Sequence, residues 1–360
     1  MFDLKLEIEN FLSIKKAKIK NFNNITILVA PNRAGKTQLL QFLYSFFWSL
    51  WIEQKEKENL FFQIDKKIKN VFLIKNKKDL LSWGKEKGFF NLTIKKNQLS
   101  YRFYYSLEKK NSNYHIGYDE GIHKKIVPIK SPVYLQPAGL GDYYKGVYSL
   151  KKYYPHWKLI SETITDLLSD LFIVSSGKIE IDENNKKLLE LFEKLFYSKF
   201  YIQNDRIYIQ EKNKKYGIEK TASGLKSLSW FYLILRYNLI GNIIFIDEPE
   251  VNLHPIYIDK LAYFLYKLSQ NRKIFIATHS DYLLESFNKL IAKHDFKIDI
   301  WVGELENDRA VYTSYEANKD NLIDTTPLNE TYTKIIKELF EYEGDIELWR
   351  NSRRIFYKDK

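Results

Sequence analysis

The order of elements between Ser223 and residue 302 constrains the fold more than any other feature of the sequence. An apolar helix that opens at Ser223 is followed by short apolar strands at 243–246, 274–277 and 297–302, with amphipathic helices between consecutive strands. Strands that alternate with helices in this way pair in parallel, because each helix returns the chain to the starting edge of the sheet. The pattern therefore predicts an α/β domain built on a parallel sheet.

Another apolar strand, predicted at residues 25–30, runs directly into a loop and a helix. That loop and the start of the helix read APNRAGKTQ, in which Gly35, Lys36 and Thr37 match the end of the phosphate-binding pattern G-x-x-x-x-G-K-[ST]. Backbone N–H groups and the helix N-terminus of such a loop bind phosphate, the lysine adds positive charge, and the threonine hydroxyl binds Mg²⁺. Ala30 stands where the first glycine of the pattern is expected, and alanine adopts a positive φ only at a cost.

Two adjacent carboxylates, Asp247 and Glu248, end the apolar strand at 243–246. Like charges at the edge of a core are costly unless a cation lies near them. Because the carboxyl ends of parallel strands meet at one edge, we expect Asp247 to reach, through water, a magnesium ion at the phosphate-binding loop. Glu248 would then polarise the water that attacks the γ-phosphate. His279 follows the strand at 274–277 and is expected at the same edge, in contact with the γ-phosphate.

Ser223 and Gly224 open an apolar helix and so provide a second helix N-terminus that can bind an anion. The complete set of motifs resembles the ABC-type ATPases, most closely their soluble SMC/RecF-like and OLD-like branch. The motifs that carry the resemblance are APNRAGKT (Walker A), ASGLKSL (signature), IIFIDEPEVNLHP (Walker B) and IATHS (switch). The resemblance implies a head-to-tail homodimer that holds two Mg-ATP, each between the Walker A of one chain and the signature of the other.

The resemblance also assigns roles to individual residues. The cofactor contacts within one chain are Asn32, Arg33, Ala34, Gly35, Lys36, Thr37 and Gln38. Ser223 and Gly224 are expected to contact the ATP that a second copy holds. Lys36, Glu248 and His279 are the catalytic residues that it implies, with Glu248 as the base.

The implied metal residues are Thr37, Asp247 and Gln136. Gln136, in YLQPAG, is the best candidate for the glutamine that connects the two lobes, and Gln38 is the alternative. The segment from Glu250 to His254, which includes Asn252, is expected to form part of the dimer seam.

The predicted fold is a single ABC-type ATPase head over residues 1–360, with a RecA-like parallel sheet core, an antiparallel β subdomain and a helical lobe. Its predicted parts are an N-terminal lobe at 1–138 with a β insertion at about 89–133, a helical lobe at 139–235 that ends in the signature helix, a Walker B and switch part at 236–305, and a C-terminal extension at 306–360 with a basic tail. No heptad tract is long enough for an extended coiled coil, and no acidic cluster typical of a Toprim nuclease is present.

The net charge of +12 favours nucleic acid as a partner, although a lysine-rich surface from an AT-rich genome explains it equally well. We expect a slow ATPase that acts as a nucleotide-driven switch in DNA repair, DNA maintenance or antiviral defence, with a separate effector protein. The alternative is a regulatory or scaffold ATPase that organises a protein partner without nucleic acid. The charged N-terminus and the lack of a candidate membrane span predict a cytoplasmic protein without membrane contact.

Overall fold

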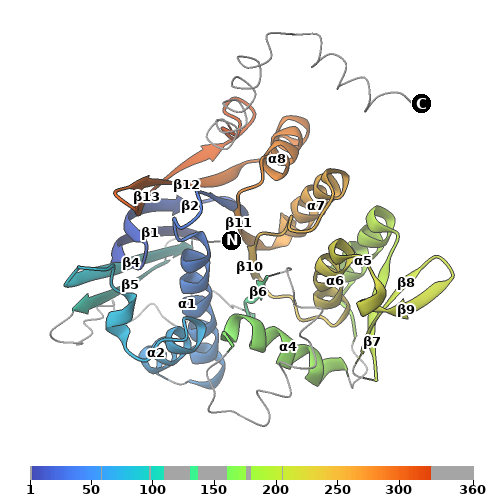
Figure 1. Cartoon of the computed structure of the whole chain (residues 1–360), viewed down its shortest axis with the longest axis horizontal. Coiled ribbons are helices and arrows are strands. Elements are labelled where there is room, and N and C mark those ends of the chain that lie inside the picture. The colour runs from blue at the N-terminus through green and yellow to red at the C-terminus, as the bar shows by residue number, and fades with distance from the viewer. Residues whose placement is uncertain are drawn as a thin grey trace, which may run out of the picture.

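A mixed sheet forms the centre of the computed structural model, which describes residues 2–57, 59–96, 99–108, 130–136, 160–175, 180–204 and 206–325 (Figure 1). Within these residues the sheet has ten strands. They are β1 (Asp3–Phe11), β2 (Ile14–Asn21), β3 (Ile25–Val29), β4 (Lys87–Lys96), β5 (Leu99–Glu108), β6 (Val133–Leu135), β10 (Ile243–Asp247), β11 (Lys273–Thr278), β12 (Ile298–Glu306) and β13 (Arg309–Ala317). Their order across the sheet is β5-β4-β1-β2-β13-β12-β3-β11-β10-β6.

One half of this sheet is parallel. From β12 through β3, β11 and β10 to β6, every neighbouring pair runs in the same direction. The other half, β5-β4-β1-β2, is antiparallel and continues the same sheet, joined to the parallel half by β13. The predicted parallel core is confirmed, and the predicted antiparallel region is an extension of its sheet.

Helices cover both faces of the sheet, which gives three layers (Figure 1). The helices are α1 (Lys36–Glu56), α2 (Leu60–Val71), α4 (Glu162–Ser175), α5 (Glu183–Phe196), α6 (Ser223–Arg236), α7 (Pro255–Leu268) and α8 (Asp281–His294), with short 3₁₀ turns η1 (Lys77–Leu80), η2 (Ile218–Lys220) and η3 (Ser269–Asn271). Neighbouring strand residues point to opposite faces, so Phe245 packs in the core with α1 and α2, and Ile246 packs in the core with α6 to α8.

A separate sheet of three antiparallel strands lies beyond α5 and α6, at the right of Figure 1. Its strands are β7 (Lys199–Gln203), β8 (Arg206–Glu211) and β9 (Lys214–Gly217). β7 and β8 form an antiparallel hairpin in which Gln203 pairs with Arg206. Phe200 and Ile209 turn inward and attach this small sheet to the helices.

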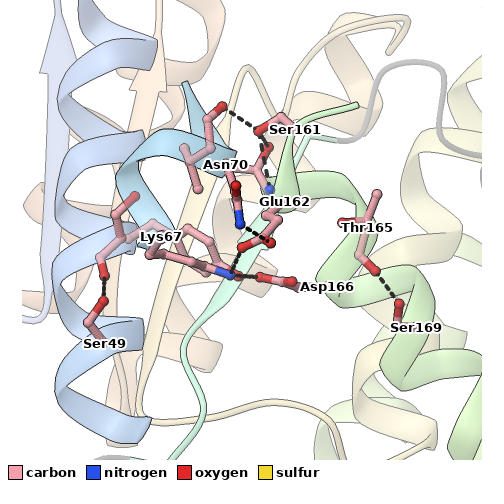
Figure 2. A network of polar contacts seen from close by, with 12 residues as sticks. Ser49, Lys67, Asn70, Ser161, Glu162, Thr165, Asp166 and Ser169 are labelled. Atoms are coloured by element: carbon pink, nitrogen blue, oxygen red, sulfur yellow. Dashed lines mark hydrogen bonds and ion pairs between the residues drawn. The ribbon is translucent and has the colours of Figure 1, made fainter. Parts of the chain in front are cut away.

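A buried lysine joins the helices of the N-terminal half to α4, the first helix described after Gln136. The Lys67 side chain on α2 is 1% exposed, and its ammonium contacts Glu162 at 2.9 Å and also Asp166 (Figure 2). The Tyr44 hydroxyl on α1 donates to Asp166 at 2.5 Å, and the Lys67 Nζ lies 3.7 Å from the centre of the Trp48 ring. This network fixes α4 against α1 and α2.

The elements from α6 to β12 confirm the predicted alternation within one or a few residues at each end. Strands β2, β9 and β13 were not predicted. β13 lies inside the sheet, between β12 and β2, although its sequence falls in the predicted C-terminal extension. The basic tail of the predicted C-terminal extension and most of the β insertion after residue 108 lie outside the described residues.

Candidate functional site

Three neighbouring strands end together at one edge of the parallel sheet. β11 lies between β3 and β10, and its register pairs Thr278 with Val29 and Ala277 with Asp247. The loop after β3, the Asp247-Glu248 pair and the segment Thr278–Ser280 therefore meet at this edge. The sequence prediction that these motifs come together is consistent with the register.

The loop after β3 opens α1 without a side-chain cap. Gly35 is the N-cap residue with φ +83°, and it makes no side-chain cap hydrogen bond to the first turn of the helix. Arg33 also has a positive φ, +69°, and both Asn32 and Arg33 are exposed. Uncapped N–H groups at a helix N-terminus form a binding site for an anion such as phosphate.

Ala30 occupies its position in the loop without backbone strain, because it does not adopt a positive φ. Its methyl group is accommodated by Gly303 on β12. A Cβ atom at Gly303 would lie only 2.9 Å from the Ala30 Cβ. The departure from the glycine pattern is thus matched by a glycine on the neighbouring strand.

Lys36 is the first residue of α1, and its side chain turns back into the loop. Its Nζ donates to the Ala30 carbonyl at 2.6 Å and to the Pro31 carbonyl at 3.3 Å, and the residue is only 7% exposed. Burial lowers the pKa of Lys36, and the carboxylates of Glu248 and Asp247 oppose this effect. The ammonium is therefore held among acidic groups at the edge where the strands end.

Asp247 is the most deeply buried of the predicted site carboxylates, at 5% exposure. Its Oδ2 accepts a hydrogen bond from the Tyr134 hydroxyl at 3.2 Å, and the Thr37 hydroxyl also bonds to its side chain. Burial raises the pKa of Asp247. Its Oδ1 is buried and has no hydrogen-bond partner among the described residues. An unpaired carboxylate oxygen next to a hydroxyl is the kind of donor set that Mg²⁺ prefers, so these residues fit the predicted metal.

Glu248 and His279 form a pair at the outer side of the same edge. His279 Nδ1 lies 3.1 Å from Glu248 Oε1, and the two side chains are 50% and 40% exposed. Glu248 has a positive φ, +53°, which is uncommon for a residue with a side chain, and its N–H donates to the Ala277 carbonyl at 2.9 Å. The strained turn directs the carboxylate away from the strand and toward the histidine.

Glu250 was predicted to lie in a dimer seam, and for its side chain that prediction is wrong. The residue is 7% exposed, and its Oε1 accepts a hydrogen bond from the Thr278 hydroxyl at 2.5 Å. The turn at Glu248 reverses the chain, so the Glu250 side chain returns beneath the end of β11. Asn252 and His254, by contrast, are exposed, and the His254 side chain caps α7.

Ser223 and Gly224 open α6, as predicted, and Ser223 is exposed. A Cβ atom at Gly224 would lie 2.7 Å from the Asn252 carbonyl oxygen, so the signature helix packs closely on the loop that follows Glu250. Within the described residues, no hydrogen bond joins Ser223 or Gly224 to residues 30–38. The signature and the phosphate-binding loop of one chain are therefore not bonded to each other.

The two candidate glutamines have different surroundings. Leu135 pairs with Ile246 in the register of β6 and β10, so Gln136, the next residue, follows at the same edge as Asp247. The Gln38 Oε1 accepts hydrogen bonds from the Ser13 hydroxyl at 2.6 Å and from the Ser13 N–H at 3.3 Å. The side chain of Gln38 is thereby fixed to the turn between β1 and β2.

A cleft of about 960 Å³ opens beside Gln38. The turns from β1 to β2 and from β12 to β13 and the segment from η1 to β4 surround it, and its lining includes Ser13, Trp83 and Arg309. Trp83 is 98% exposed, although an indole ring is among the most apolar side chains. A ligand that extends from Thr37 past Gln38 would enter this cleft.

Three residues of this region were not predicted from the sequence, namely Ser13, Trp83 and Tyr134. Tyr134 alone carried a usable signal, since it sits in the short strand directly before Gln136. The described residues contain no group of three or more His, Cys, Asp or Glu that could hold a metal ion by themselves. No helix in the described part of the chain is both long and apolar enough to cross a membrane.

Residues 33–285 match the model of the protein family described as "AAA domain, putative AbiEii toxin, Type IV TA system". Among solved structures, the chain is similar to an SMC head bound to the C-winged helix domain of ScpA, with 13% identity, a TM-score of 0.57 and coverage of 86% of this chain and 97% of that one.

It is also similar to an SMC head with an extended coiled coil, bound to the C-terminal domain of ScpA derived from Pyrococcus furiosus. That match has 12% identity, a TM-score of 0.51 and coverage of 94% of this chain and 100% of that one. At such identities the likeness shows the fold alone, and it agrees with the predicted ATPase head. Comparison with curated proteins found no match.

Proposed function

Because the chain belongs to this AAA-domain family and has the fold of an SMC-like ATPase head, we propose that it binds and hydrolyses Mg-ATP where β3, β10 and β11 end. One observation supports this most directly. The buried Asp247 Oδ1 has no partner within the described residues, beside the Thr37 hydroxyl and the uncapped start of α1. A buried unpaired carboxylate oxygen is costly, and a bound cation would relieve that cost.

The phosphates would bind at the start of α1. The N–H groups from Asn32 to Gln38 would contact the phosphate oxygens, and the Lys36 ammonium would exchange its bonds to the two loop carbonyls for the β- and γ-phosphates. The nucleoside would occupy the cleft beside Gln38, with the exposed Trp83 ring available for stacking on the base.

Thr37, Asp247 and Gln136 would hold Mg²⁺. The ion would neutralise negative charge on the phosphate oxygens. Tyr134 supports this arrangement because its hydroxyl orients the Asp247 carboxylate. Gln136 is preferred to Gln38 for this role, since Ser13 already occupies the Gln38 side-chain oxygen.

Glu248 would act as the general base that accepts a proton from the attacking water, and His279 would orient that water and contact the γ-phosphate. Both side chains are about half exposed, so a surface from elsewhere has to exclude solvent from the reaction. The surface that we propose is the start of α6 in a second copy, with its exposed Ser223 and partly exposed Gly224, in a head-to-tail dimer around two ATP.

A Glu248→Gln variant tests this proposal. Glutamine keeps the shape of the side chain but cannot act as the base, so Mg-ATP hydrolysis should fall by about 100-fold or more while ATP still binds. Light scattering should show dimers of the variant with Mg-ATP and monomers without nucleotide. A Glu190→Gln variant on α5, an exposed position away from the site, serves as the matched control. Hydrolysis by Glu248→Gln at the wild-type rate, or an unchanged monomer mass with Mg-ATP, would contradict the proposal.

We further propose that the dimer acts on nucleic acid as a switch in DNA maintenance or antiviral defence, together with a separate effector. The net charge of +12 supports a polyanionic partner. The outer face of the three-stranded sheet also suits one, since the Lys215 ammonium lies 4.6 Å and 5.3 Å from the centres of the Tyr201 and Tyr208 rings. DNA affinity should therefore fall steeply and log-linearly with salt concentration. Absence of DNA binding at about 0.15 M salt would favour the alternative, an ATPase that organises a protein partner.

A further inference from the structure

Glu250 is a buried carboxylate that none of the proposed steps uses. The residue is 7% exposed, and its Oε2 is buried without a hydrogen-bond partner among the described residues. Burial of a carboxylate costs several kcal/mol unless its contacts compensate, roughly as for any buried ion. A glutamate in this position therefore needs a reason beyond packing, because an apolar residue of similar size would fill the same space.

The contacts of Glu250 lead directly to the segment Thr278–Ser280, here called the switch segment. The Thr278 hydroxyl donates to Glu250 Oε1 at 2.5 Å, and the Thr278 Oγ1 accepts a hydrogen bond from the Ser280 N–H at 3.0 Å. A hydroxyl that donates in one direction and accepts in the other has its orientation fixed. Glu250 thereby fixes the backbone on both sides of His279, the one residue between Thr278 and Ser280.

Glu250 is also tied to the proposed base. The turn that begins at Glu248 is closed by a hydrogen bond from the Val251 N–H to the Glu248 carbonyl at 3.2 Å, with Glu250 inside it. Glu250 therefore lies in the backbone turn that carries Glu248, and its side chain holds Thr278, the neighbour of His279, near the 3.1 Å contact between His279 Nδ1 and Glu248 Oε1. Only the second of these links depends on the Glu250 carboxylate.

We propose that Glu250 is a positioning residue that holds His279 against Glu248 through Thr278, so that base and switch keep the geometry that hydrolysis requires. The inference rests on the proposed function, because it concerns the rate of the same reaction. A positioning role and a merely structural role of Glu250 predict different effects on kcat and on ATP binding. Loss of the anchor should lower kcat while ATP binding, which depends on the loop at the start of α1, is maintained.

Two pairs of variants test the proposal in the full-length protein. Glu250→Ala removes the acceptor, whereas Glu250→Gln keeps an oxygen that the Thr278 hydroxyl can reach. Thr278→Val removes the hydroxyl with little change in shape, whereas Thr278→Ser keeps it. The readouts are kcat and KM for Mg-ATP, with thermal unfolding of each variant as a check that it is folded.

Glu250→Ala and Thr278→Val should each lower kcat by about 10- to 100-fold, because a misplacement of about 1 Å in a site costs up to about 100-fold in rate. KM should stay within about threefold of the wild-type value, since uniform binding is retained. Glu250→Gln and Thr278→Ser should recover most of the lost rate. If Glu250→Ala does not fold, the Thr278 pair still decides the question.

Wild-type kcat in Thr278→Val, or equal losses in Thr278→Val and Thr278→Ser, would overturn the proposal. Failure of the proposed function looks different. In that case the wild-type protein would either not hydrolyse ATP or hydrolyse it at the same rate as Glu248→Gln. A wild-type enzyme that depends on Glu248 but is insensitive to both Glu250→Ala and Thr278→Val would overturn the role of Glu250 alone.

Discussion

Gly35→Ala is expected to damage the phosphate-binding loop more than its small size suggests. Gly35 has φ +83°, where a residue with a Cβ pays roughly 1–2 kcal/mol. Its new Cβ would also lie 2.6 Å from the Ser13 hydroxyl and 3.0 Å from Gln38 Oε1, atoms that are hydrogen-bonded to each other. Loss of that bond adds about 1 kcal/mol. The free energy of unfolding should therefore fall by about 2–3 kcal/mol.

Gly84 provides the matched control, since it has a similar φ of +74° but no atom within 4 Å of an added Cβ. Gly84→Ala should cost only the backbone strain of about 1–2 kcal/mol. Urea unfolding of both variants measures the difference, and titration with ATP should show weaker binding for Gly35→Ala than for wild type. Equal losses of stability in the two variants, with unchanged ATP affinity, would refute the reasoning that the loop is closely packed against Ser13.

Three further predictions concern other parts of the molecule. Burial lowers the pKa of Lys273 to about 8, below its unfolded value of 10.5, so the unfolded state binds more protons than the folded state between these two pH values. The free energy of unfolding should therefore rise by about 1.4 kcal/mol per pH unit in this range, and urea unfolding should show this slope in wild type but not in Lys273→Met. Trp83→Ala should leave stability within about 0.5 kcal/mol but weaken ATP binding about 5- to 100-fold, with binding of inorganic tripolyphosphate unchanged, as calorimetry would measure. Lys67→Met should lower the free energy of unfolding by about 2–4 kcal/mol, because Glu162 and Asp166 lose their cation. The control Lys55→Met, at an exposed ammonium 5.0 Å from the centre of the Trp51 ring, should lower it by less than about 1 kcal/mol, and equal losses in chemical denaturation would contradict this.

Strands β10 and β11 of the parallel half were predictable because each is a short apolar run between two helices. β10 and β11 are buried along their whole length, so their sequences carry no polar alternation that could mislead. β2 and β13 were harder to recognise. Lysines alternate with apolar residues in IKKAKIKN, but the strand follows β1 after only two residues, and β13 pairs with β2 from about 300 positions away. Such pairing depends on tertiary contacts that local pattern does not encode.

The candidate site was predictable where a motif has a fixed spacing, as in Gly35, Lys36 and Thr37. It was not predictable where the contact depends on three-dimensional packing. Glu250 was placed at a seam because it follows the Walker B carboxylates, but the left-handed turn at Glu248 reverses its direction. Nothing in the sequence indicates that Trp83 lines the cleft next to Gln38.

The distribution of burial at this edge bears on how the reaction would be controlled. Lys36, Asp247 and Glu250 are each 7% exposed or less, and each is held by contacts within the chain. Glu248 and His279, the proposed base and its partner, remain about half exposed. The groups that would bind ATP are thus held within one chain, whereas the groups that would carry out hydrolysis are open to water. This arrangement favours slow hydrolysis by a single copy and faster hydrolysis once a second copy covers the edge. Glu250 would then hold Glu248 and His279 in contact with each other until the second copy binds. This role gives a reason for a buried carboxylate, Glu250, two residues after the exposed Glu248.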